Sequence, residues 1–347
     1  MDNLWYLEYS YTSLNQLLAL CTKNSAVIVA LILFFAGSIN AQNDASFYHL
    51  DVRDGLSQNS VYDITQDRQG FIWVATEFGL NRWDGKTFMH YLHKDGDSNS
   101  MSNNFLNCIY EDSKGTLWLG TNGSGISKFN KKKGTFENYA FASHKDSLFQ
   151  NNSVWSITED ENSNLWIGTF GGGLKYFDTK TGTITSYQGI FSRQLGRNCK
   201  DIRKISVNND GTLWLGAFDG GLYHFDPITK NIKSIKLIDG LDSYRAMSLL
   251  NQDSVLWIGS YANGAFRLNT LTQTVERYLY QDQEFITGAF IRDMVVDPRY
   301  PNSIWFTVWN KGVYKLDVRN GTYNKYKQEK DNKQSLASNA VLPLFAD

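Results

Sequence analysis

The amino-acid sequence predicts an all-β fold, a β-propeller of four-stranded blades, and three observations predict it. A segment centred on tryptophan recurs six times along the 347 residues. Each repeat contains four short runs of strand-forming residues separated by turn residues. The composition includes 10 Trp, 19 Tyr, 21 Phe and 28 Gly but only 4 Pro, which is typical of aromatic-rich strands joined by tight turns.

The tryptophan repeat sets the blade length. Successive repeats are separated by 45, 48, 48, 43 and 48 residues, and a four-stranded blade needs about 40 to 50 residues. We expect each indole to form part of the blade core by filling the wedge between neighbouring blades, where it can bury about 200 Å². The six residues are Trp73, Trp118, Trp166, Trp214, Trp257 and Trp305.

The second repeat displays the expected strands of one blade. Residues 105–110 form a mostly apolar inner run, and residues 116–121, 126–130 and 135–139 supply the other three strands. The turn 112–115 begins with an aspartate, which can bond its own backbone, and ends with a glycine, which accepts a positive φ. A further glycine follows each tryptophan by six or seven residues, at Gly79, Gly125, Gly173, Gly221, Gly264 and Gly312.

The two ends of the repeat region determine the expected number of blades. Residues 47–50 resemble the outer strand of a repeat, and residues 335–347 repeat the opening of a blade. We therefore predict six complete blades plus a partial seventh, a truncated seven-bladed geometry over residues 42–347 that is incomplete at the C-terminus. The alternative is a six-bladed ring that residues 47–50 close, with the tail displaced.

The N-terminal residues 1–41 are predicted to form an extension and a signal peptide. Residues 26–36 are strongly apolar, and small residues lead to a cleavage site after Ala41. Eleven apolar residues suit a secretion signal better than a membrane span, which needs about 20, although an uncleaved anchor is the alternative. The sequence therefore predicts export.

Charge and cysteine usage argue against several classes of protein. The formal net charge is −1, from 34 basic and 35 acidic residues interspersed along the chain, so no field favours nucleic acid as a partner. Cys21, Cys108 and Cys199 lie far apart, and the five histidines share no ligand spacing, so we predict no metal site and no cofactor. No catalytic triad or phosphate-binding loop appears, and we assign no catalytic residue.

The first repeats resemble the two-component regulator propeller repeat. Residues 55–73 read GLSQNSVYDITQDRQGFIW, which is similar to that family's blade almost residue for residue. The resemblance implies the periplasmic sensor region of a hybrid histidine kinase from Bacteroidetes, linked to polysaccharide sensing. It also implies a homodimer, and a membrane contact made only through the N-terminal segment or a further C-terminal span. The kinase part is not among these residues.

The loops between the second and third strands carry the candidate ligand-binding residues. Aromatic residues at a channel mouth would suit stacking against an oligosaccharide, with Glu77, Asp219, Asn263 and Asn310 orienting its hydroxyls. The alternative is that these rings fill gaps between blades. The candidates are Phe78, Asn122, Phe170, Phe218, Tyr261 and Trp309.

Two other functions remain open from the sequence. Propellers host glycosidases and lyases, and a sialidase-like enzyme would need arginines at the channel mouth together with a Tyr-Glu pair. A protein-binding scaffold is the other alternative. The run Lys131-Lys132-Lys133 is interpreted as a solvated hairpin tip. The arginines near inter-blade segments are Arg193, Arg197, Arg203, Arg245 and Arg292.

Overall fold

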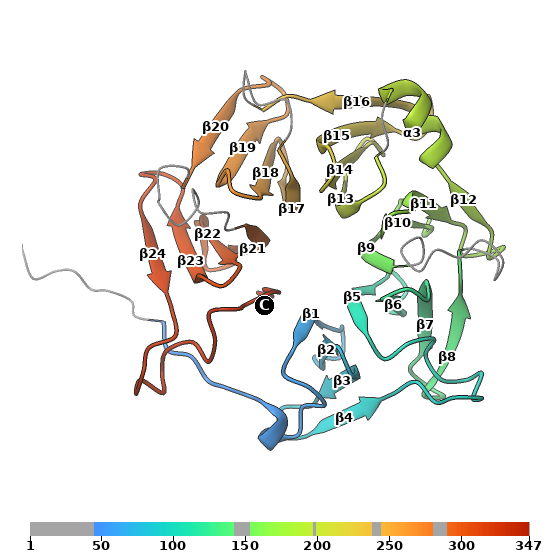
Figure 1. Cartoon of the computed structure of the whole chain (residues 1–347), viewed down its shortest axis with the longest axis vertical. Coiled ribbons are helices and arrows are strands. Elements are labelled where there is room, and N and C mark those ends of the chain that lie inside the picture. Colours follow the sequence, from blue (N-terminus) through green and yellow to red (C-terminus); the bar gives the residue numbers. More distant parts are fainter. Residues whose placement is uncertain (1–44, 142–152, 197–198, 238–243, 280–289, 347) are drawn as a thin grey trace, which may run out of the picture. The chain divides into compact units, whose positions relative to one another are not determined.

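The computed structural model of the chain describes residues 45–141, 153–196, 199–237, 244–279 and 290–346. The chain divides into two units, Met1–Ser46 and Phe47–Asp347. The predicted signal peptide and its cleavage site lie outside the described residues. Within the second unit, six sheets surround a central axis, and the first strand of each sheet is innermost (Figure 1).

Each sheet contains four consecutive antiparallel strands, as the repeat predicts. Blades one to three comprise β1 (Val61–Gln66), β2 (Ile72–Thr76), β3 (Gly79–Trp83), β4 (Phe88–Tyr91), β5 (Leu106–Glu111), β6 (Leu117–Thr121), β7 (Ile126–Asn130), β8 (Thr135–Tyr139), β9 (Ser153–Glu159), β10 (Leu165–Phe170), β11 (Gly173–Phe177) and β12 (Ile184–Ser186). Blades four to six comprise β13 (Ile202–Val207), β14 (Leu213–Ala217), β15 (Gly221–Asp226), β16 (Asn231–Ile235), β17 (Ala246–Gln252), β18 (Val255–Ser260), β19 (Ala265–Asn269), β20 (Val275–Tyr278), β21 (Ile291–Asp297), β22 (Tyr300–Val308), β23 (Gly312–Asp317) and β24 (Tyr323–Tyr326).

Two short helices accompany the blades. The 3-10 helix η1 (Val52–Asp54) precedes the first blade, where the Asp51 side chain accepts a hydrogen bond from the Arg53 backbone. The α-helix α3 (Gln188–Leu195) follows β12 and buries Phe191 against the core of the fourth blade. Neither helix interrupts the sheets, so the described fold is all-β in character.

The predicted partial seventh blade is wrong. The described residues form six sheets, and no strand is present in residues 327–346 or 45–60. The C-terminal tail instead lies extended against the sixth blade, where the backbone N–H of Gly312 donates to the Asn339 carbonyl at 3.0 Å. A segment with strand-like sequence needs a neighbouring strand to complete its hydrogen-bond ladder, and neither terminal segment has one.

Residues 47–50 also differ from the expectation that they form an outer strand. The Phe47 N–H donates to the Gln334 carbonyl at 3.1 Å, and the His49 ring lies 2.7 Å from the Ser335 carbonyl oxygen. These contacts join the two ends of the unit through loops. The outermost strand of the sixth blade is β24, and no other described segment pairs with it.

The repeated tryptophans lie between successive blades. Trp73, in the first blade, packs in one apolar cluster with Leu106 and Leu117 of the second blade. Trp118 packs in the same way with Val154 and Leu165 of the third blade. The indoles of blades one to five are at most 4% exposed, whereas Trp305 is partly exposed.

An aspartate clamps the indole in three blades. In the second blade, Asp112 Oδ1 accepts from the backbone N–H groups of Lys114 and Thr116, and Oδ2 accepts from Trp118 Nε1 at 2.9 Å. The aspartate therefore fixes the hairpin turn and orients the core tryptophan with one carboxylate. The same indole contact is made by Asp67 to Trp73 and by Asp297 to Trp305.

The clamp is absent from the fourth blade. Asn208 occupies the turn position, its Nδ2 donates to Thr212 Oγ1, and Trp214 Nε1 is buried without a hydrogen-bond partner among the described residues. Blades two and four thus provide a natural comparison.

We predict that Asp112→Ala lowers the free energy of unfolding by about 2 to 3 kcal/mol, because a buried indole N–H loses its acceptor and the turn loses two bonds. Asn208→Ala is the matched control and should cost about 1 kcal/mol or less, since no indole bond is lost. Urea unfolding followed by tryptophan fluorescence measures both values. Equal losses in the two variants would contradict the clamp.

A second prediction concerns the recurring glycine. Gly125 has φ +78°, and a Cβ there would clash with the Tyr139 carbonyl oxygen, whereas Gly134 has φ +67° and open space around it. Both alanine variants carry the left-handed backbone cost of about 1 kcal/mol. We expect Gly125→Ala to lose at least about 2 kcal/mol more than Gly134→Ala in the same unfolding assay, because its neighbour is rigid backbone.

Candidate functional site

Every inner strand carries a β-bulge at the same position. In the first blade Val61 pairs with Thr76 and Asp63 with Ala75, so Tyr62 is an extra residue without a partner. The register shifts in the same way in the other five inner strands. A bulge changes the direction in which the side chain of the extra residue points, and bulges are frequent beside functional sites.

The six extra residues meet at one cavity, and we call them the bulge ring. The cavity has a volume of about 360 Å³ and is lined by all six inner strands together with Leu342, Pro343 and Leu344 of the C-terminal tail. One bulge residue from each blade contributes to its wall. The bulge ring consists of Tyr62, Asn107, Trp155, Arg203, Met247 and Arg292.

The residue after the bulge connects neighbouring blades. Asp63 Oδ2 accepts from the Ile109 backbone N–H at 2.8 Å, and Ser156 Oγ accepts from the Ile205 N–H at 3.2 Å. Burial raises the pKa of Asp63 to about 6, although the Lys204 charge and these backbone bonds oppose the rise. Side chains next to the bulge ring therefore hold adjacent inner strands together.

Several polar atoms at this site are buried without hydrogen-bond partners among the described residues. They include donors on Asn107, Trp155 and Arg203 and acceptors on Asn107 and Asp201. An unsatisfied buried group costs about 1 to 3 kcal/mol, so such a cluster is unusual in a finished core. The atoms are Asn107 Nδ2 and Oδ1, Trp155 Nε1, Arg203 Nε and Asp201 Oδ1.

Aromatic rings surround the arginines of this site. The Arg203 Cζ atom lies 4.4 Å from the Trp155 ring centroid, and 5.3 and 5.2 Å from those of Phe170 and Phe218. Its Nη2 donates to Asp201 Oδ2 at 2.7 Å. Burial raises the pKa of Asp201 to about 6, opposed by the Arg203 charge. The guanidinium is thus held by stacking and by one ion pair.

Two more arginines extend the same arrangement. The Cζ atom of Arg245 lies 4.5 Å from the Phe218 centroid and 5.1 Å from that of Tyr261, and Arg292 Cζ lies 5.1 Å from the Trp155 centroid. We call Arg203, Arg245 and Arg292 with their rings the arginine stack. It draws on blades three to six.

Four of the six candidates predicted from the loops lie at or next to the arginine stack. Phe170, Phe218 and Tyr261 contact its guanidinium groups directly. Trp309 stacks on Phe290 with centroids 5.9 Å apart, and Phe290 in turn stacks on Tyr261 at 5.7 Å. Whether these rings bind a ligand stays a prediction.

The other two candidates are placed differently. Phe78 is 50% exposed and has no aromatic or cationic partner within the described part of the chain. Asn122 Oδ1 accepts from Ser153 Oγ at 3.0 Å, which ties the second blade to the third. Of their polar neighbours, Glu77 accepts a hydrogen bond from the Tyr62 hydroxyl at 2.9 Å and so reaches the bulge ring.

The bulge ring was not predicted, although the sequence contains a signal for it. In every inner strand two apolar residues are spaced three apart, whereas a regular strand places every second residue on one face. Both members of each pair in blades two to six lie in the same apolar cluster. An inserted residue explains the spacing. The pairs are Val61/Ile64, Leu106/Ile109, Val154/Ile157, Ile202/Ile205, Ala246/Leu249 and Ile291/Met294.

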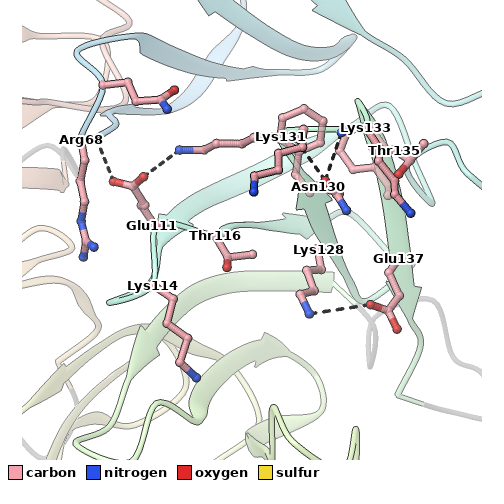
Figure 2. A pocket seen from close by; sticks show the side chains of 15 residues that line it. Arg68, Glu111, Lys114, Thr116, Lys128, Asn130, Lys131, Lys133, Thr135 and Glu137 are labelled. Atoms are coloured by element: carbon pink, nitrogen blue, oxygen red, sulfur yellow. Dashed lines mark hydrogen bonds and ion pairs between the residues drawn. The ribbon is translucent and has the colours of Figure 1, made fainter.

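A second cavity of about 600 Å³ lies at the hairpin turns of the first two blades (Figure 2). The run Lys131-Lys132-Lys133 was expected to be a solvated tip, but Lys131 bridges Asp67 Oδ2 at 2.9 Å and Glu111 Oε1 at 2.8 Å. Lys132 and Lys133 are exposed. Lys131 therefore supports the aspartate clamp of the first blade, and the cavity offers no arrangement of aromatic rings and unsatisfied polar atoms like that of the bulge ring.

Other predicted features are placed as follows. Cys108 and Cys199 are buried, and neither forms a disulfide among the described residues; Cys21 and Arg197 lie outside those residues. Arg193 belongs to α3, away from the inner strands. No cluster of potential metal ligands is found among the residues that the structure describes. Within the same residues, no helix has the length and apolarity that crossing a membrane requires.

Comparisons with known proteins agree with the repeat. Residues 55–78, 100–123 and 148–171 match the family described as two component regulator propeller. A segment of 75 residues is 48% identical to "Histidine kinase P4" of Formosa agariphila, and it covers 21% of this chain and 6% of that kinase.

Solved structures are similar to most of the chain. The extracellular domain of a putative hybrid two-component system from B. thetaiotaomicron is 26% identical, with a TM-score of 0.70, over 85% of this chain and 38% of that one. The extracellular domain of a putative one-component system from the same organism is 20% identical, with a TM-score of 0.70, over 88% of this chain and 38% of that one. This chain spans less than two fifths of either relative. Segments of its first three blades match the two component regulator propeller family, and the propeller is similar to the extracellular domain of a putative hybrid two-component system.

Proposed function

We propose that this chain is the ligand-binding propeller of a periplasmic sensor in a two-component system, and that its ligand is an oligosaccharide. The observation that carries the proposal is the group of unpartnered donors and acceptors beside the stacked rings of the bulge ring. In the longer protein a histidine kinase would respond to the bound state, with the sensor acting as a homodimer attached to the membrane.

The chemistry of the site supports a sugar. Sugar hydroxyls donate and accept hydrogen bonds, and Asn107, Arg203 and Asp201 together offer both kinds of group. The apolar faces of sugar rings pack against aromatic faces such as those of Trp155 and Phe170. The 360 Å³ volume lies at the lower end of the range for small-molecule sites.

The position of the site supports sensing. The bulge ring takes one residue from each blade, and Asp63 and Ser156, one residue further along, hold adjacent inner strands. A ligand that shifts bulge residues would therefore bear on the contacts between blades. A ligand changes a conformational equilibrium only through such differential contacts.

A thermal-shift screen with oligosaccharides tests the proposal. We expect at least one oligosaccharide to stabilise the wild-type protein, by about 2.7 kcal/mol at 100 times its Kd. Asn107→Ala and Phe170→Ala should reduce this shift, since they remove hydrogen-bonding groups and a stacking face. Phe78→Ala is the matched control and should retain it, because Phe78 contacts no residue of the site.

Two outcomes would count against the proposal. One is a screen in which no oligosaccharide stabilises the wild type. The other is a sugar that stabilises wild type, Asn107→Ala and Phe170→Ala equally, which would place binding elsewhere.

A glycosidase is the second candidate, and one observation favours it. Tyr62, whose hydroxyl donates to Glu77, lines the same cavity as Arg203 and Arg292, and a sialidase-like enzyme requires a Tyr-Glu pair with arginines. Burial and the Glu77 carboxylate raise the pKa of Tyr62 to about 12, so the phenol is protonated at neutral pH. Attack by Tyr62 would need Glu77 to accept its proton.

We expect no turnover, because the sensor proposal requires binding alone. Incubation of the protein with the oligosaccharides of the screen, followed by an assay for new reducing ends, measures this. Release of sugar by the wild type that Tyr62→Phe abolishes would assign a glycosidase instead.

A further inference from the structure

We propose that the ligand of the central cavity is an acidic saccharide, whose anionic group is bound by Arg292 in the cavity wall. This inference rests on the proposed function and specifies the class of sugar. It depends on which charged groups around the bulge ring already form hydrogen bonds or ion pairs within the protein.

The carboxylates around the cavity are bonded within the protein. Asp63 accepts from the Ile64 and Ile109 backbone N–H groups, and Asp293 accepts from the N–H groups of Met294 and Leu344, at distances of 2.8 to 3.0 Å. Asp201 is paired with Arg203, and Glu77 accepts from Tyr62. Each of these acids therefore already has a hydrogen-bond donor of its own within the protein.

The cations around the cavity have fewer partners in the described chain than the carboxylates do. Arg203 has Asp201, but Lys204, Arg245 and Arg292 have no carboxylate oxygen within 4.0 Å anywhere in the described chain. Arg203, Lys204 and Arg292 line the cavity, as do Asp63 and Asp293. Because Arg203 is paired with Asp201, the cavity wall keeps two cations without an ion pair in the described chain, Lys204 and Arg292. Arg245 is exposed and is not part of that wall.

Stacking positions the guanidinium groups without neutralising them. Arg245 is held between Phe218 and Tyr261, and Arg292 lies over Trp155. Burial lowers the pKa of Arg292, but arginine stays protonated in proteins. A guanidinium fixed in this way can bind a carboxylate or sulfate with paired hydrogen bonds at a low entropic cost.

The surroundings of these cations indicate that the anion belongs to a sugar. An inorganic anion would use only the guanidinium groups, whereas Trp155 and Asn107 beside them offer a ring face and an amide with unsatisfied atoms. Uronic acids and sulfated sugars carry both the charge and the hydroxyls that such a wall would bind. These two sources share the same anion chemistry and are separated by experiment.

The test is isothermal titration of the protein with matched acidic and neutral oligosaccharides. One arm uses oligogalacturonates and alginate oligomers, which carry carboxylates. A second arm uses sulfated chondroitin disaccharides, and a third uses neutral galacto- and manno-oligosaccharides. We expect an acidic sugar to bind at least tenfold more tightly than the neutral sugar of the same length, and its affinity to fall as NaCl rises from 50 to 500 mM.

Variants test which cation of the protein binds the anionic group of the sugar. Arg292→Gln should weaken acidic binding at least tenfold and leave neutral binding unchanged, while Arg292→Lys should retain part of the affinity because it retains the charge. Lys132→Gln is the matched control, since it removes an exposed cation beside the other cavity. If Arg292→Gln does not fold, Lys204→Gln carries the same test, because Lys204 is the other cation of the cavity wall without an ion pair in the described chain.

The outcomes separate the two proposals. A neutral sugar that binds as tightly as its acidic counterpart, with no effect of Arg292→Gln or Lys204→Gln, overturns the charge inference and leaves the oligosaccharide proposal standing. Failure of every sugar in all three arms overturns both. Binding in the first arm alone assigns a uronate, and binding in the second alone assigns a sulfated sugar.

Discussion

Packing of each tryptophan against the following blade is the interaction on which the rest of the structure depends. The five apolar clusters each combine the indole of one blade with residues of the next, so no blade has a complete core of its own. This packing sets the spacing between inner strands and hence the width of the cavity that they enclose. The aspartate clamp also orients the indole, because one carboxylate bonds both the indole N–H and the neighbouring hairpin turn.

The bulges depend on the same packing. In the second blade, Leu106 and Ile109 both lie in the cluster of Trp73 although three positions separate them. Both residues can reach that cluster only if one residue between them leaves the regular ladder, and Asn107 does so. The core therefore determines which residue faces the cavity. The core does not fix the residue type at the bulge position. Equivalent positions in the six blades therefore hold Tyr, Asn, Trp, Arg, Met and Arg.

The sequence predicted features that depend on local chemistry. The blade period, the four strands and the turns follow from strand-forming runs, the turn aspartate and the recurring glycine, and all of them are present. The number of blades depends on partners far apart in the chain, and this prediction failed at both ends. Residues 47–50 and 335–346 have strand-like composition, but strand formation also requires a neighbour with free hydrogen-bonding groups.

The site was predicted only in part for a similar reason. Counting residues past each tryptophan found Phe170, Phe218 and Tyr261, because the hairpin fixes their positions relative to the repeat. Their partners Arg203 and Arg245 come from the following inter-blade segment or inner strand, and a count within one repeat does not bring them together. The formal net charge of −1 likewise gave no indication that Lys204 and Arg292 would line one cavity without an ion pair in the described chain.

The unsatisfied polar atoms would connect the site to the proposed sensing. Asn107, Trp155 and Arg203 bury donors that lack acceptors among the described residues, and each such group costs free energy. A sugar that supplied the missing partners would gain binding free energy beyond that from contact area, because it would remove this cost. It would reach the buried atoms only if the side chains of the bulge ring shifted. Asp63, next to Tyr62, also bonds the neighbouring inner strand. Under the proposed function, ligand binding would therefore be coupled to the contacts between blades through adjacent residues, without a hinge between separate domains.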